Sequence, residues 1–189
     1  MVKLSESHLN IIQLLLQAGA DPSQKNFKQN FPLLSLAEKN SQDQKISAKF
    51  VKLLLKNGAR VDSPRHNSDT KLEEFALGEA VRNENIEIVK VLLKNNADMN
   101  IPLADKSGIY TPLGLAIRTQ NASLIKLFVK HGQTQCVYNE HRTNNDLTDC
   151  INLIMSYYTR DIRKELTLKD PSLPFLKSIP FDARLIGKY

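Results

Sequence analysis

The sequence predicts an all-α fold, a solenoid of helix–turn–helix units with a helical C-terminal cap and tail. Two observations predict this class. Similar apolar segments at helical spacing recur four times within the first 132 of the 189 residues, each followed by Gly or Asn. A second apolar stretch precedes each of the last three segments. Such units pack on their neighbours in sequence, and the result is a row of stacked helix pairs.

Each recurring segment reads as a helix and its end. In the third, Ile88 and Leu92 lie four residues apart and Val89 falls between them, which makes one apolar stripe at helical period. A residue that tolerates the left-handed conformation then ends the helix, and Asn is the best substitute for Gly there. These end positions are spaced by 39, 38 and 36 residues and are Gly19, Gly58, Asn96 and Gly132.

The stretch that precedes the fourth segment has the clearest helix start. Residues 111–116 read TPLGLA, in which Thr111 can cap the first free amides. Pro112 suits the first helical position, where its missing N–H costs nothing. The matching stretches begin at Pro32 and Ala76, and they lack the capping Thr. We therefore expect a first helix of each pair to begin at these three positions.

These residues resemble the ankyrin repeat, whose pattern is a Thr-Pro-Leu-His-like opening, a Val-Val-x-x-Leu-Leu-like helix and a Gly-Ala-Asp turn. The resemblance covers roughly residues 8–133, although the copies exceed the usual 33 residues. It implies an array over residues 1–133 of about three and a half repeats that begins with a second helix. Because a leading half-repeat would leave its inner face uncovered, we expect the chain to be a piece of a longer protein.

Residues 134–189 form the second predicted unit, a helix and a Pro-containing tail that cap the array. Apolar residues recur at helical spacing over 146–164, and Leu147, Ile151 and Ile154 are examples. Three prolines then exclude a long helix in the apolar tail over 165–189. Two interpretations remain open for this tail. It either packs on the last helices or recruits a ubiquitin ligase, as boxes at the ends of some ankyrin proteins do.

Composition argues against several other classes. The net charge is +6, but the 26 Lys and Arg are spread along the chain, so we do not expect nucleic-acid binding. No apolar run is long enough for a membrane span. The scattered glycines form no phosphate loop, and no cofactor is expected. The two cysteines favour a reducing intracellular setting with free thiols.

One cluster could suggest a metal or a nucleophile. His131, Cys136, His141 and Cys150 are spaced by five, five and nine residues, and they lack the close pairs of compact zinc sites. Nothing places a base beside either thiol. The adjacent carboxylates Glu73 and Glu74 are expected in a solvated helix start. We therefore predict no metal site, no catalytic residues and no enzyme activity.

The resemblance implies that binding falls on the loop tips and on the adjoining face of the first helix of each repeat. These positions are free of core packing, and a rigid stack holds them in a row. Tyr110 and Arg118 are the first candidates, because aromatics and Arg dominate binding hot spots. The alternative is that Tyr110 packs on a neighbouring tip and Phe27 lies in the core. The full candidate set is Tyr110, Arg118, Lys106, Ser107, Ile109, Thr119, Arg82, Asn83, Arg65, His66, Asn67, Lys25 and Phe27.

The expected function is that of a non-catalytic scaffold that binds a partner protein through these tips and the concave helix face. The alternative is a regulatory or targeting domain of a longer enzyme or a ubiquitin-ligase adaptor. Irregular arrays rich in Lys and Asn are associated with host-directed bacterial or viral proteins. We expect an intracellular monomer in the cytoplasm, or in the host cytoplasm if the chain is a secreted effector.

Overall fold

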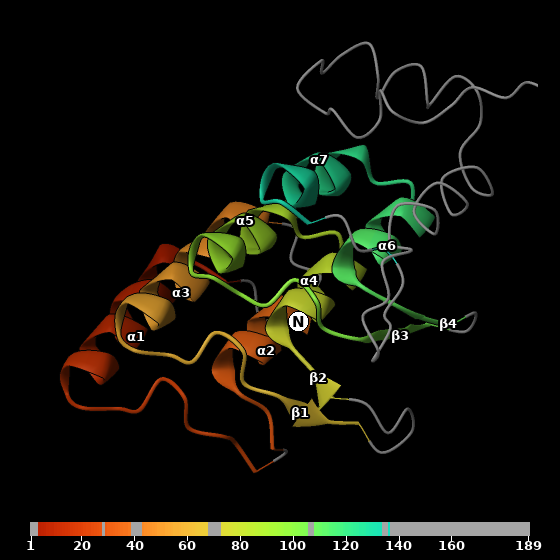
Figure 1. Cartoon of the computed structure of the whole chain (residues 1–189). Helices are drawn as coiled ribbons and strands as arrows, with labels where there is room; N and C mark the ends of the chain where they lie inside the picture. The colour runs from red at the N-terminus through yellow and green to blue at the C-terminus, as the bar shows by residue number, and fades with distance from the viewer. Residues whose placement is uncertain are drawn as a thin grey trace, which may run out of the picture.

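A computed structural model describes residues 4–27, 29–38, 43–67, 73–105, 108–133 and 136 of the chain (Figure 1). Within these residues the chain forms α-helices and four short strands. In chain order they are α1 (Glu6–Gln17), α2 (Pro32–Glu38), α3 (Gln44–Lys56), β1 (Arg65–His66), β2 (Glu73–Glu74), α4 (Ala76–Arg82), α5 (Ile86–Lys94), β3 (Leu103–Asp105), β4 (Gly108–Tyr110), α6 (Pro112–Arg118) and α7 (Ala122–Lys130).

The helices stack in two layers, as predicted. One layer, here called the outer layer, contains α1, α3, α5 and α7 side by side, and the other, the inner layer, contains α2, α4 and α6 (Figure 1). Each inner helix also packs on the outer helix that follows it in the chain, so that α2–α3, α4–α5 and α6–α7 are the repeating pairs. The predicted all-α solenoid of helix–turn–helix units is confirmed.

Two hairpins extend the loops between repeats, where the sequence had predicted only loops. β1 pairs with β2, and β3 pairs with β4, both antiparallel. Each strand has two or three residues, which is too short for an alternating apolar pattern to reveal it. Glu73 and Glu74 form β2, so the expectation that they begin a helix was wrong: α4 begins at Ala76.

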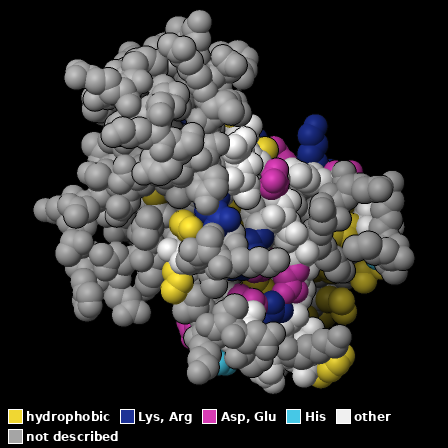
Figure 2. Space-filling view, turned by 90° about the vertical axis from the view of Figure 1, so that its right-hand side faces the viewer, with side chains coloured by type: hydrophobic (Ala, Val, Ile, Leu, Met, Phe, Trp, Pro, Cys, Tyr) yellow, Lys and Arg dark blue, Asp and Glu magenta, His cyan; other side chains and the backbone are white. Residues whose placement is uncertain are grey.

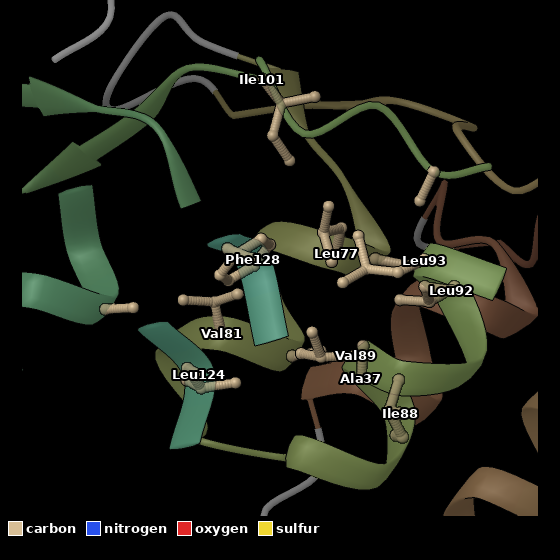
Figure 3. Packing of buried hydrophobic residues seen from close by; sticks show 14 of the residues in the cluster. Ala37, Leu77, Val81, Ile88, Val89, Leu92, Leu93, Ile101, Leu124 and Phe128 are labelled. Atoms are coloured by element: carbon tan, nitrogen blue, oxygen red, sulfur yellow. The ribbon is translucent and has the colours of Figure 1, made fainter. Parts of the chain in front are cut away.

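The apolar core lies between the two layers (Figure 3). From α4, Leu77 and Val81 are 1% and 0% exposed, and from α5, Ile88 and Leu92 are both fully buried. Phe128 of α7 reaches the same cluster (Figure 3). The periodicity that predicted the helices therefore also identified their buried faces.

Local signals begin and end the helices where expected. Thr111 Oγ1 accepts a hydrogen bond from the Gly114 amide at 3.2 Å, and Asn85 Oδ1 accepts one from the Ile88 amide at 3.1 Å. No side chain caps α4, as the missing Thr at Phe75 predicts. The helix-ending residues all have the left-handed backbone predicted for them, with φ values of 93°, 91°, 60° and 83° at Gly19, Gly58, Asn96 and Gly132.

Helix α1 is the first helix of the described residues, and it lies in the outer layer beside α3. None of its residues is buried, and Ile11, Leu14 and Leu15 are 54%, 65% and 55% exposed. Leu15 precedes its Gly by four residues, as Leu92 precedes Asn96, yet Leu92 is fully buried. The difference arises because, among the described residues, only α3 packs closely on α1.

The last described residues pack on α6. The Thr111 amide donates a hydrogen bond to the Cys136 carbonyl at 3.1 Å, and the side chains of Gln133 and Cys136 are buried. Cys136 is bound in a disulfide, so the expectation of a free thiol there was wrong. The predicted cap over 134–189, including the helix at 146–164, lies outside the described residues apart from Cys136.

The described part of the chain contains neither a membrane-spanning helix nor a cluster of metal-ligating side chains. None of its helices has the length and apolar character needed to cross a bilayer. Among the described residues, no three side chains of His, Cys, Asp or Glu come together as metal ligands would. His131 is exposed at the end of α7, and His141 and Cys150 of the considered zinc cluster lie outside these residues.

Candidate functional site

The candidate interaction surface follows one edge of the array. The loop before α2, the β1–β2 hairpin and the β3–β4 hairpin lie along this edge beside the inner helices (Figure 1). Basic and acidic side chains gather next to one another on the face that carries the hairpins (Figure 2). The stacked helices hold these loops in a row, which is the arrangement that the sequence predicts for binding.

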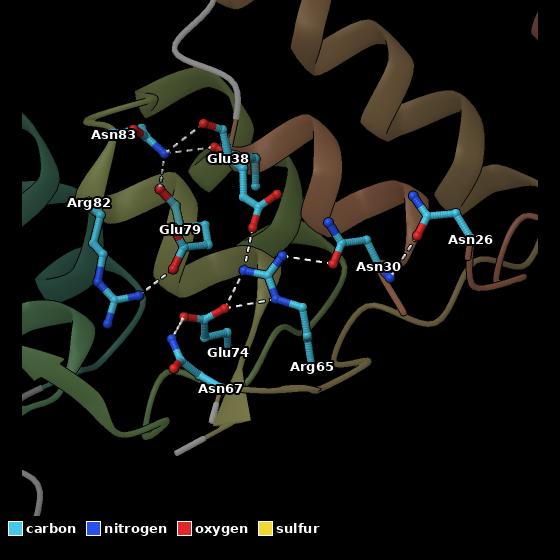
Figure 4. Close-up of polar contacts among 10 residues, drawn as sticks. Asn26, Asn30, Glu38, Arg65, Asn67, Glu74, Glu79, Arg82 and Asn83 are labelled. Atoms are coloured by element: carbon cyan, nitrogen blue, oxygen red, sulfur yellow. Dashed lines mark hydrogen bonds and ion pairs between the residues drawn. The ribbon is translucent and has the colours of Figure 1, made fainter. Parts of the chain in front are cut away.

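Arg65 of β1 lies at the centre of a polar cluster (Figure 4). Its Nε donates to Glu74 Oε2 at 2.8 Å, and its Nη1 donates to Asn30 Oδ1 at 2.8 Å. The guanidinium also forms ion pairs with Glu74 and with Glu38, the last residue of α2. One half-buried side chain thereby joins the loop before α2, the end of α2 and the next hairpin.

The charges of this cluster stabilise one another. Burial opposes ionisation of Glu74, but the hydrogen bond from Asn67 and the guanidinium of Arg65 together hold the pKa of Glu74 below its usual value. Burial likewise disfavours the charged form of Arg65, and yet its bonds to Glu74 and Glu38 raise the Arg65 pKa. Both groups are therefore charged at neutral pH and hold each other in place.

A second ion pair lies on α4, where Arg82 pairs with Glu79 one turn away. Burial raises the pKa of Glu79, and the negative charges of Glu74 and Glu38 add to the effect, although Arg82 opposes it. Asn83 Nδ2 donates to the carbonyls of Ala37 and Glu38 at 3.1 and 3.3 Å, which ties the end of α4 to the end of α2 (Figure 4).

Four predicted binding residues thus contact the array itself. Arg65 and Asn83 bridge neighbouring repeats, while Asn67 and Arg82 bind the carboxylates beside them. In the structure, these side chains fix the relative position of the loops and the inner helices. Partner binding by them stays a prediction.

Tyr110 and Arg118 lie together at the third inner helix. The Arg118 guanidinium carbon is 5.0 Å from the centre of the Tyr110 ring, a cation–π geometry. Tyr110 is only 9% exposed, so its ring lies within the repeat and not on the surface. Ile109, next to it in β4, is 41% exposed. Lys106 and Ser107 lie outside the described residues.

The remaining candidates are on the surface. Phe27 is 89% exposed, so the alternative that it belongs to the core is wrong. Lys25 Nζ lies 4.8 Å from the centre of the Phe31 ring. His66 and Thr119 are also exposed. Phe27, His66 and Ile109 therefore offer exposed side chains at three successive tips.

Sequence reasoning missed the acidic members of this surface. Glu38 is the last residue of α2, and Arg82 and Arg118 are the last residues of α4 and α6. An alignment of the three repeats would have placed Glu38 in the same set as the two predicted arginines. Glu79 lies three residues before Arg82 on α4, a spacing at which helical side chains pair, so the sequence did contain a signal for it. Glu74 had no such signal, because its partners Arg65 and Asn67 lie seven to nine residues earlier in the chain and only the fold brings them together.

The comparisons with known proteins agree with the geometry. Residues 1–103 match the family model for ankyrin repeats, in three copies. The chain belongs to the ankyrin repeat family. Ankyrin repeats generally mediate protein–protein interactions, and the family is generally non-catalytic. The helix pair α6–α7 follows the matched residues and continues the same stack.

Individual relatives are also ankyrin repeat proteins. The chain is 32% identical over 122 residues, 64% of its length, to an ankyrin repeat protein of Fowlpox virus (strain NVSL), and this match spans 33% of the viral protein. A second protein of this virus is 29% identical over 65% of the chain and 76% of its own length. An ankyrin repeat and KH domain-containing protein of Caenorhabditis elegans is 32% identical over 66% of the chain but only 4% of its own length.

Proposed function

We propose that the chain is a non-catalytic scaffold that binds a partner protein through its loop tips and the inner helix face. One observation carries the proposal: Phe27, His66 and Ile109 are exposed at successive tips of one edge, and each tip is held by the stack behind it. A partner then meets preformed contacts, and little flexibility is lost on binding.

The polar cluster supports this proposal by making the surface rigid. Arg65 links two successive loops through Asn30 and Glu74, and Asn83 links two inner helices. Exposed side chains on such a framework keep their relative positions in the absence of a partner. We therefore assign the cluster a positioning role and the exposed tip residues a contact role.

A tip variant tests the proposal. Phe27→Ser, His66→Ala and Ile109→Ser would be combined in one chain, because all three side chains are exposed and their loss leaves the core intact. Wild type and variant would each be used to capture partners from a cell lysate, with circular dichroism as the check on folding. Leu14→Ser is the matched control, since it removes an exposed apolar side chain from α1, away from this edge.

A partner retained by wild type and by Leu14→Ser but lost by the tip variant would support the scaffold. The same partner captured equally by all three proteins would exclude this edge as its binding surface. An alternative function is a regulatory or targeting domain of a longer enzyme or ubiquitin-ligase adaptor. The chain spans 33% and 4% of two relatives' own lengths, and a catalytic or ligase-recruiting sequence in the full-length gene would support this alternative.

A further inference from the structure

The positive charge of the chain is concentrated in the outer layer. Helices α3, α5 and α7 contain eight lysines and one glutamate, a net charge of +7. The whole chain has 26 Lys and Arg against 20 Asp and Glu, a net charge of +6, so the rest of the chain sums to −1. Lysines that are dispersed along the sequence are thus gathered by the fold into three neighbouring helices.

These lysines occupy equivalent positions. Each outer helix from α3 onward carries a pair four residues apart, and α3 carries two more near its start. Side chains four apart share one side of a helix, and here that side is opposite the buried residues. All are exposed except Lys126, which is partly exposed. This lysine face consists of Lys45, Lys49, Lys52, Lys56, Lys90, Lys94, Lys126 and Lys130.

The stacking turns the pairs into a two-dimensional array. α3 packs on α5, and α5 packs on α7, in one layer (Figure 1). Axes of packed helices are about 8–10 Å apart, and four helical residues rise about 6 Å. Such spacings are no greater than the screening length of about 10 Å at 0.1 M salt, so the potentials of neighbouring lysines add.

Local helix stability does not account for the array. Lys56, Lys94 and Lys130 lie in last turns, where a cation favours the helix dipole. The other five lysines have no such role. Within the described part of the chain, ion pairs engage two of the eight: Lys49 with Glu6 and Lys90 with Glu87. Most of the charge therefore faces solvent without an acidic neighbour.

We propose that the lysine face docks the protein on an anionic membrane surface through lipid headgroups such as phosphatidylserine. A plane can approach all eight lysines together, because they project from one layer of helices, whereas a nucleic-acid cylinder would reach one strip of them. The three helices also contain no Arg for base-edge contacts, and their two aromatic residues, Phe50 and Phe128, are fully buried and cannot stack on bases.

The docking is purely electrostatic and peripheral. Among the described residues, the exposed large apolar side chains lie on α1, on the loop before α2 and on β4, and none lies on α3, α5 or α7. Nothing on the lysine face therefore inserts into the bilayer. The inner layer and the hairpins lie on the opposite side of the stack, so a membrane-bound molecule would present its tips away from the surface (Figure 1).

Vesicle binding tests the proposal. The full chain would be sedimented with vesicles of phosphatidylcholine alone and of phosphatidylcholine mixed with phosphatidylserine. The main variant combines Lys52→Gln, Lys90→Gln and Lys126→Gln, because α1 carries Gln13 at the equivalent position and Gln is a comparable helix former. The control compares two single variants, Lys25→Gln and Lys52→Gln. Both remove one positive charge, but Lys25 lies outside the lysine face, in the loop before α2.

Selective binding to the phosphatidylserine vesicles is expected, and added salt should weaken it. Each lysine near such a surface contributes on the order of fivefold, so the triple variant should bind about a hundredfold more weakly. Glu87→Gln removes the one acidic residue of the three helices and should strengthen binding. Lys25→Gln should leave binding unchanged.

Three results would overturn the proposal. One is that the protein binds both vesicle types equally, or binds neither of them. A second is a triple variant that binds as wild type does. The third has two parts: duplex DNA or RNA displaces the protein from the vesicles, and the triple variant binds that nucleic acid more weakly than wild type does. This result would assign the lysine face to nucleic acid.

Discussion

The Arg118 guanidinium lies over the ring of Tyr110, 5.0 Å from its centre, and Tyr110 is 9% exposed. Tyr110 is the last residue of β4 and Arg118 is the last residue of α6, so the contact holds β4 against the end of the helix that follows it. Tyr110 is therefore part of the packing of its repeat, whatever else it does.

This contact predicts unequal effects of the two substitutions. Tyr110→Ala should lower the free energy of unfolding by about 3 kcal/mol, because it empties a buried aromatic site. Arg118→Ala should cost only about 1 kcal/mol, the usual size of a partly exposed cation–π contact. Urea denaturation followed by circular dichroism measures both. If Tyr110→Ala unfolds at the wild-type urea concentration, the buried placement of the ring is wrong.

The leading half-repeat predicts a difference between equivalent leucines. Leu92→Ala in α5 should cost about 2–5 kcal/mol, because the side chain is fully buried. Leu15→Ala in α1 should cost less than about 1 kcal/mol, because the side chain is 55% exposed. Ile88→Val and Ile11→Val form a second, milder pair. Equal losses for Leu15 and Leu92 would mean that α1 is covered as α5 is.

The polar cluster predicts a pH dependence. The folded-state pKa of Glu74 is depressed, so its contribution to stability is present above the unfolded pKa of about 4.3 and is lost as pH falls through the folded pKa. At pH 7, Glu74→Gln should cost about 1–3 kcal/mol, the scale of hydrogen bonds to charged groups. Unfolding of wild type and variant, measured from neutral to acidic pH, should converge at low pH.

The matched control for this prediction is Glu87→Gln. Its ion pair with Lys90 is exposed, with side chains 37% and 46% exposed, so the change should cost less than about 1 kcal/mol at any pH. If Glu74→Gln lowers the free energy of unfolding at neutral pH no more than Glu87→Gln does, Glu74 does not hold the loops in the way described.

Two helical glycines should differ in how well they tolerate substitution by alanine. A Cβ at Gly114 would lie 1.7 Å from the Cys136 carbonyl oxygen, which is backbone and cannot swing away, so Gly114→Ala should destabilise by more than about 2 kcal/mol. At Gly78 the Cβ would meet the end of the Leu103 side chain at 2.4 Å, and that group can rotate. Because Ala also gains about 1 kcal/mol of helix propensity, Gly78→Ala should lose less. Thermal midpoints distinguish the two, and a Gly114→Ala midpoint at or above that of Gly78→Ala would count against the close approach of residue 136 to α6.

The sequence alone identified most of the helices and their caps. Thr111, Asn96 and the apolar stripe with Ile88 and Leu92 act within a few residues, so their signals can be read without knowledge of the fold. The two hairpins could not be predicted in the same way, because β1 and β2 each contain two residues and pair across an intervening loop.

Two features of the surface were decided by the tertiary structure. The sequence showed Arg65 and Asn83 as candidate contacts, but the stacking of repeats placed them against Asn30 and the end of α2. It also brought Lys52, Lys90 and Lys126 onto one face. The physical reason is the same in both cases. The offset between repeats some 36 to 39 residues apart determines which side chains meet, and that offset is fixed by packing between helices and not by any local pattern.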